Sequence, residues 1–115
     1  MPAKTAPRSR VSPARACALR VIRRAFEQSA YADRAFAGEA AELEPRDRAL
    51  AMALSYGTVQ RRATLDHVAG KFSSRPVSKL DAPVLAAVRL GLFQLLFLDG
   101  IAAHAAVNEI GRAHV

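Results

Sequence analysis

The sequence predicts a single all-α domain, and three observations favour that fold class. The chain has 115 residues, which is about the size of one domain. Alanine and leucine are abundant while aromatic residues make up only 6%, a composition that favours helices over strands. Apolar residues recur at helical spacing, and no segment shows the alternation of a half-buried strand. We therefore expect a bundle of helices with short connections.

Helical periodicity and helix-terminating residues define each element in turn. Ser12 is a suitable N-cap, with Pro13 in the first helical position. The helix that follows places Ala18, Ile22 and Phe26 on one face. Helices are expected at about residues 13–28, 31–43 (a weaker stretch), 45–60, 62–72 and 80–98, and a sixth begins at 102–107.

The packing of these helices can be anticipated from a few side chains. The 45–60 helix is apolar around most of its circumference, which predicts a central helix wrapped by its neighbours. Gly57 is unfavourable inside a helix, so we expect it to mark a close approach of another helix, and we interpret Gly91 in the same way. Tyr31 and Phe36 are predicted to pack in the core.

Several classes of protein are excluded by the composition. Cys17 is the only cysteine, so no internal disulfide can form; we predict a cytoplasmic protein with Cys17 as a small core residue. The N-terminus lacks the apolar segment of a secretory signal. The longest apolar stretch, 84–98, is too short and too polar to span a membrane. The three histidines lack metal-ligand spacing, so no metal site is expected.

The positive charge is concentrated at one end of the chain. The formal net charge is +7, and residues 1–24 contain seven basic residues and no acid. Fourteen of the seventeen bases are arginines, whose planar guanidinium suits phosphate. We expect residues 1–12 to form a flexible basic arm and the arginines of the first helix to extend it, toward a polyanion such as nucleic acid. The alternative is a solvated face, on which Glu27 pairs with Arg23 or Arg24.

Five segments, at 14–16, 45–50, 55–62, 89–98 and 104–109, together resemble the NusB superfamily in order and spacing. The run Leu-Gly-Leu-Phe-Gln-Leu-Leu-Phe-Leu-Asp at 90–99 and His-Ala-Ala-Val-Asn-Glu at 104–109 resemble one branch of it. That branch is the N-terminal domain of the Sun/Fmu (RsmB) type of 16S rRNA cytosine-C5 methyltransferase. The resemblance covers about residues 14–109.

The resemblance implies two packed helical subbundles and an RNA-binding domain over residues 13–109. It implies RNA contact mainly through the basic N-terminal region. Carried onto this chain, the candidate RNA-binding residues are Arg8, Arg10, Arg15, Arg20, Arg23 and Arg24, with Arg61 and Arg62 as weaker candidates. Arg15 lies on the apolar side of the first helix, so a structural role is its alternative.

The resemblance also implies an S-adenosylmethionine-dependent enzyme as the full-length parent, although this chain carries no catalytic centre. The glycine-rich loop and the catalytic cysteines of such enzymes are absent from the sequence. Cys17 has no nearby base that would activate a thiolate. We expect no catalytic residue and no cofactor in this chain, and we expect 16S rRNA as its partner.

The last residues, 110–115, depart from the family pattern and match a translated sequencing adapter, so we expect a non-native tail. The second subbundle would then lack its last helix, and the chain would be marginally stable. Two other functions stay open. One is a free-standing antitermination factor of the NusB type, which would bind RNA with a ribosomal protein. The other is a helical protein-interaction domain with an incidental basic tail.

Overall fold

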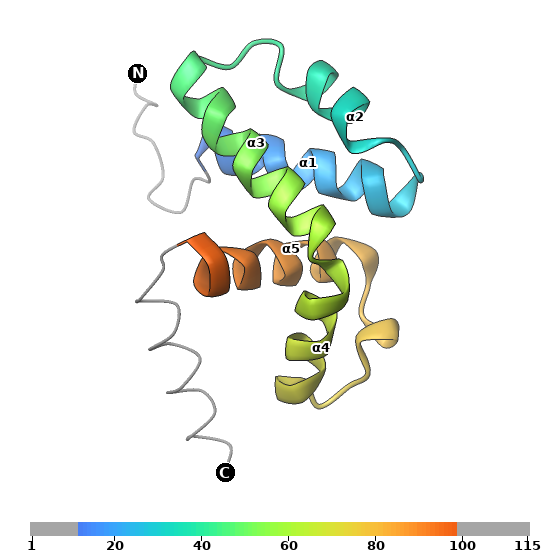
Figure 1. Ribbon diagram of the computed structural model, residues 1–115. Helices are drawn as coiled ribbons and strands as arrows, with labels where there is room; N and C mark the ends of the chain where they lie inside the picture. Colours follow the sequence, from blue (N-terminus) through green and yellow to red (C-terminus); the bar gives the residue numbers. More distant parts are fainter. Residues whose placement is uncertain (1–11, 99–115) are drawn as a thin grey trace, which may run out of the picture.

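The computed structural model describes residues 12–98, and every regular element within them is helical. The all-α prediction is therefore confirmed for this part of the chain. Within it, five α-helices are joined by short connections, with a 3-10 turn before the last helix and a π-helical turn after it (Figure 1). The elements are α1 (Pro13–Glu27), α2 (Ala32–Glu39), α3 (Pro45–Gln60), α4 (Arg62–Phe72), η2 (Val77–Lys79), α5 (Ala82–Phe93) and η3 (Gln94–Leu98).

The helix boundaries follow the local signals in the sequence where those signals are strong. The Ser12 side chain accepts a hydrogen bond from the backbone N–H of Arg15 at 3.2 Å, which confirms it as the N-cap of α1. Helices α3 and α4 begin and end at the expected residues. Helix α2 is shorter than expected, and α5 begins at Ala82 rather than residue 80. The expected 80–98 helix also changes from α to π geometry at Gln94.

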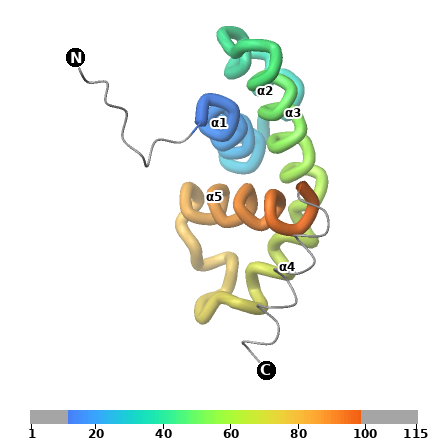
Figure 2. The backbone as a smooth tube through the Cα atoms, turned by 90° about the vertical axis from the view of Figure 1, so that its left-hand side faces the viewer, coloured from blue at the N-terminus to red at the C-terminus, as the bar shows by residue number. Residues whose placement is uncertain are grey.

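The helices form two groups, as the resemblance implied. Helices α1, α2 and α3 pack together, and α4 and α5 form the second group below them in Figure 1. Arg61 alone separates α3 from α4, where the chain changes direction. Seen from the side, α5 crosses between the first group and α4 (Figure 2). Helix α5 therefore contacts α1, α3 and α4, and it joins the two subbundles.

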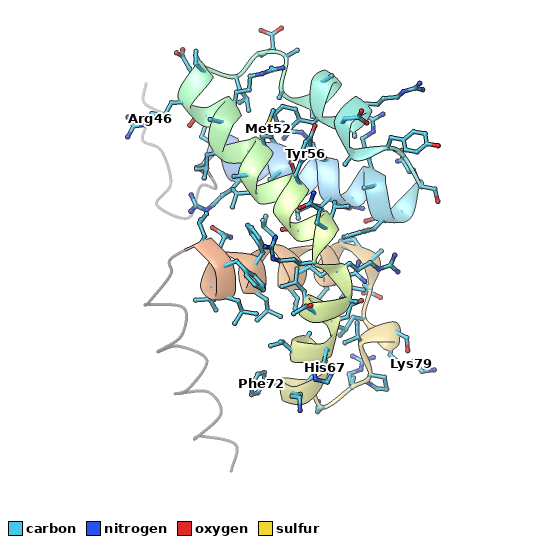
Figure 3. All side chains as sticks on the ribbon, in the orientation of Figure 1. Arg46, Met52, Tyr56, His67, Phe72 and Lys79 are labelled. Atoms are coloured by element: carbon cyan, nitrogen blue, oxygen red, sulfur yellow. The ribbon has the colours of Figure 1, made fainter. Side chains whose placement is uncertain are left out.

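Helix α1 lies at the centre of the packing because two of its faces are buried. Ala14, Cys17 and Val21 pack into a core cluster with α2 and α3, and the adjacent face, with Ala18 and Ile22, packs into a second cluster with α4 and α5. Helix α3 contacts the other four α-helices of the described residues, as predicted for a central helix, but they do not cover it completely. Met52, labelled on α3 in Figure 3, is 41% exposed, because α4 and α5 contact α3 near its C-terminal end.

Of the two aromatic residues predicted for the core, Phe36 is buried and Tyr31 is exposed. Phe36 is buried and meets the ring of Tyr56 edge-on, with 5.7 Å between centroids, as expected. Tyr31 is 72% exposed, so that prediction was wrong. Tyr31 precedes the first turn of α2, and its ring lies against the guanidinium of Arg34, 5.8 Å from the centroid. A position outside the helix has no neighbouring helix to pack against.

The two subbundles approach each other closely at Gly57. A Cβ built on Gly57 would overlap the Cζ and Cε1 atoms of Phe93, whose ring packs directly over the α3 backbone. The predicted close approach at Gly57 is therefore confirmed. Among residues 12–98, a Cβ built on Gly91 would meet no atom within 4 Å, so the close packing predicted for Gly91 is not found in this part of the chain.

A buried ion pair connects α4 and α5 beside this contact. The Arg89 side chain is 5% exposed, and its Nε and Nη2 donate to Asp66 Oδ1 and Oδ2 at 2.7 and 2.8 Å. The Arg89 guanidinium lies 4.4 Å from the centroid of the Phe26 ring of α1. Arg89 thus makes its polar contacts with α4 and its stacking contact with α1, which fixes three helices relative to one another.

Some expectations fall outside the described residues. These are the basic arm over residues 1–11, the sixth helix at 102–107 and the tail at 110–115. The expected absence of a last helix from the second subbundle also concerns residues beyond 98.

Gly57 and Gly91 allow a paired test of the contact between the two subbundles. Gly57→Ala should lower the free energy of unfolding by about 1–3 kcal/mol, because the new methyl group displaces Phe93. Gly91→Ala should raise it by up to about 1 kcal/mol, because alanine favours the helix and the site is open. Urea unfolding followed by circular dichroism measures both. Equal effects of the two substitutions would contradict the packing of Phe93 on Gly57.

The Asp66–Arg89 pair predicts a second stability pattern. Asp66→Leu should destabilise the fold by about 3 kcal/mol, because it leaves the buried Arg89 guanidinium without a carboxylate. The double variant Asp66→Leu/Arg89→Met should recover much of that loss, since an apolar pair needs no compensating charge. Urea midpoints of the two variants give the comparison. A double variant no more stable than the single one would rule out this account.

Candidate functional site

Three of the predicted RNA-binding arginines share one face of α1. Because they are spaced at i, i+3 and i+4, their side chains lie on neighbouring positions of the helix surface. They line one wall of an open cavity of about 290 Å³, and the C-terminal end of α2 closes the other side. The cavity is lined by Arg20, Arg23, Arg24, Glu27, Gln28 and Glu39.

One carboxylate of this cavity comes from α1 itself. Arg23 Nε and Nη2 donate to Glu27 Oε2 and Oε1 at 2.7 and 3.1 Å, so the pair is bidentate. These hydrogen bonds lower the pKa of the Glu27 carboxyl and raise the pKa of Arg23. Of the two partners considered from the sequence for Glu27, the one four residues earlier is confirmed.

The second carboxylate comes from α2 and contacts two guanidiniums. Glu39 Oε1 accepts from Arg20 Nε at 2.7 Å, and Glu39 Oε2 lies 3.6 Å from Arg24 Nη1. Glu39 ends α2, where the partial negative charge of a helix C-terminus disfavours a carboxylate. The two arginines compensate for that position. Sequence reasoning missed Glu39, although an acid at a helix C-terminus was a signal that a cation lies nearby.

The cavity keeps a net positive charge and exposed donors. Three guanidiniums face two carboxylates, and the side chains of Arg20, Arg23 and Arg24 are 53%, 44% and 40% exposed. Guanidiniums bind phosphate and carboxylate oxygens in a planar, bidentate geometry. The arrangement is therefore suited to an anionic ligand that approaches from solvent.

Arg62 lies next to this cavity. A second cavity, of about 150 Å³, has Glu27 in its wall together with Phe26, Arg62 and Arg89. The Arg62 guanidinium lies 5.2 Å from the centroid of the Phe26 ring, and its side chain is 60% exposed. Its Nε is 3.9 Å from Asp66 Oδ2, a weak contact, because Arg89 already holds that carboxylate. Arg62 thus extends the exposed positive surface, whereas the buried Arg89 does not.

Arg15 and Arg61 lie elsewhere, against the C-terminal part of α5 and η3. Arg15 Nε donates to the Gln94 side chain at 2.6 Å, a contact that agrees with the structural alternative. The exposed Arg61 has its guanidinium 4.5 Å from the centroid of the Phe97 ring. Arg61 forms no ion pair with any carboxylate of residues 12–98.

The structure therefore brings together only part of the predicted set. Arg20, Arg23 and Arg24 share one cavity, and Arg62 adjoins it. Arg8 and Arg10 lie outside the described residues. A role in RNA binding stays a prediction for all eight arginines.

Other kinds of site find little support in the described residues. In residues 12–98, no group of three His, Cys, Asp or Glu side chains could hold a metal ion, and no helix is long and apolar enough to cross a membrane. Burial raises the pKa of the Cys17 thiol, which disfavours a thiolate. S-adenosylmethionine does not fit this part of the chain, because a dinucleotide-type glycine loop follows a strand and the described elements are all helical.

Comparison with known proteins places the chain in a family. Residues 12–112 match the model of the NusB family. The chain is 37% identical over 97 residues to a probable ribosomal RNA small subunit methyltransferase B of Synechocystis sp., covering 83% of this chain and 22% of the relative. It is 36% identical over 110 residues to a putative methyltransferase of Mycobacterium tuberculosis, covering 93% and 24%.

A ribosomal RNA small subunit methyltransferase B of Pseudomonas putida is 38% identical over 68 residues, covering 59% of this chain and 15% of the relative. The chain thus spans less than a quarter of the length of these relatives. No solved structure gives a significant match. The family model covers most of the chain, and the chain therefore belongs to the NusB family.

Proposed function

We propose that this chain is the RNA-binding, N-terminal part of a longer S-adenosylmethionine-dependent 16S rRNA cytosine-C5 methyltransferase. Its role is to position rRNA for a catalytic domain that the chain does not contain. Family membership supports this proposal, as do relatives named as small-subunit rRNA methyltransferases, of which the chain matches less than a quarter. We place the protein in the cytoplasm, where rRNA is modified.

The observation that carries the proposal is the grouping of Arg20, Arg23 and Arg24 around one open cavity, with Arg62 beside it. The phosphate backbone dominates the affinity of proteins for nucleic acids, and arginine side chains supply many of these contacts. Such contacts position an RNA without identifying its sequence. The cavity would hold backbone phosphates, and binding would weaken as salt rises.

The other arginines predicted to bind RNA differ in how far the structure supports that role. Arg8 and Arg10 stay candidates from the sequence alone. Arg61 stays a candidate because its guanidinium is exposed and contacts an aromatic ring, a pairing that also occurs in binding to unpaired bases. The hydrogen bond between Arg15 and Gln94 favours a structural role for Arg15.

The proposal assigns the chemistry to the rest of the longer protein. Cys17 is buried and its pKa is raised, so we assign it no catalytic role. We place the catalytic cysteines and the S-adenosylmethionine site outside this chain. An antitermination factor would also fit the family, but the named relatives favour the methyltransferase.

The proposal predicts the behaviour of a triple variant, Arg20→Gln/Arg23→Gln/Arg24→Gln. Neutral side chains are preferable to acids here, since acids would repel Glu27 and Glu39 and disturb the fold. Affinity for labelled fragments tiled across 16S rRNA should fall at least about tenfold at low salt. The slope of log affinity against log salt should fall in magnitude by about 2, at roughly 0.7 per lost phosphate contact. Fluorescence anisotropy over a salt series measures both.

The matched control is Lys71→Gln/Arg75→Gln/Lys79→Gln. It removes the same charge from exposed positions around the α4–α5 connection, where Figure 3 labels Lys79. This control should lose less than about threefold in affinity, because rim charges away from a contact act weakly. Equal losses in the two triple variants would reject the cavity as the RNA contact. Absence of salt-dependent binding to any fragment would reject the function itself.

A further inference from the structure

Glu39 occupies the same edge of a guanidinium that a phosphate would need. A bidentate contact with phosphate commonly uses the Nε and the neighbouring terminal nitrogen of arginine. In Arg20, Nε already donates to Glu39 Oε1 at 2.7 Å. In Arg24, the contact with Glu39 uses Nη1 at 3.6 Å, which is too long for a hydrogen bond. A phosphate can therefore reach Arg24 directly but must compete for Arg20.

The contact made by Glu39 is exposed enough to be exchanged. The Arg20 side chain is 53% exposed and the Glu39 side chain 25%, so water screens their attraction and the pair is weak. The Arg89–Asp66 pair is different, because the Arg89 side chain is only 5% exposed. Glu27 holds a single guanidinium on its own helix, whereas Glu39 reaches two guanidiniums from α2. Glu39 is therefore the carboxylate that reaches the cavity from another helix and contacts two of its guanidiniums.

We propose that Glu39 is an electrostatic gate, a carboxylate that competes with RNA phosphates for Arg20. RNA binds this cavity by displacing Glu39 from Arg20, which lowers affinity for polyanions that make few other contacts. Glu39 thus sets the selectivity of the surface. This inference rests on the proposed RNA-binding function and adds a residue whose removal strengthens binding.

The test uses Glu39→Gln in the full 115-residue chain, with affinity for a 20-nucleotide oligouridine and for the tiled 16S rRNA fragments. The amide removes the competing charge at nearly the same size. Affinity should rise about fivefold at low salt, the strength of one exposed ion pair. Glu42→Gln is the matched control. Glu42 is an exposed acid in the α2–α3 connection and forms no ion pair within residues 12–98, so its effect should stay below about twofold.

A double-mutant cycle separates competition from general charge. In the wild-type chain Arg20→Gln removes a donor that Glu39 partly occupies, whereas in the Glu39→Gln background it removes a free donor. Arg20→Gln should therefore cost about fivefold more affinity in that background. Additive effects would overturn the gate. Glu39→Asp, which keeps the charge but shortens the side chain, should give an intermediate affinity, and thermal melts show that each variant is folded.

The outcomes also distinguish the gate from the function it rests on. If Glu39→Gln binds no more tightly than Glu42→Gln, or binds more weakly than the wild type, the gate is wrong. The proposed function then still stands, provided that Arg20→Gln/Arg23→Gln/Arg24→Gln loses salt-dependent binding. If the wild-type chain binds neither oligouridine nor rRNA fragments, both proposals fail together.

Discussion

The packing of the Phe93 ring over Gly57 sets the distance between the two subbundles, and most of the other contacts depend on that distance. Only a residue without a Cβ lets a ring approach the α3 backbone so closely. One turn earlier on α5, Arg89 is then within reach of Asp66 on α4 and of the Phe26 ring on α1. The contact between the two subbundles therefore has two requirements. Gly57 must lack a side chain, and the Arg89–Asp66 hydrogen bonds must have the right direction. Apolar burial brings the helices together, and the bidentate ion pair fixes their orientation.

This packing explains why α1 presents its arginines to solvent. Two faces of α1 are buried, one with α2 and α3 and the other with α4 and α5, so only a narrow strip of its surface remains open. Arg20, Arg23 and Arg24 lie on that strip. Helix α2 closes one side of it and brings Glu39 to the arginines. The charge of the site is therefore set by α2 as much as by α1.

The sequence predicted the bounds of the helices better than the contacts between them. Helices α3 and α4 begin and end as expected because helical periodicity, and for α3 the proline in its first turn, are local properties. Tyr31 was misplaced because an aromatic side chain just before a helix lacks a fixed direction until its neighbours are known. The contact between Glu39 and Arg20 spans nineteen positions and two helices, so no periodicity within one helix reports it. The cost of glycine within a helix indicated close packing at both Gly57 and Gly91, but only Gly57 has a neighbouring ring in the described residues, because the sequence does not show which face another helix covers.

The environment decides what the same side chain does in this domain. The Arg89 side chain is 5% exposed and its role is structural. The carboxylate of Asp66 accepts hydrogen bonds from its guanidinium, and the ring of Phe26 covers the face of that group. Arg20 carries the same group at 53% exposure, where its ion pair is weak and open to exchange. A count of arginines thus overstates the charge available to a partner. The available charge belongs to those guanidiniums that remain in contact with water and whose carboxylates can be displaced.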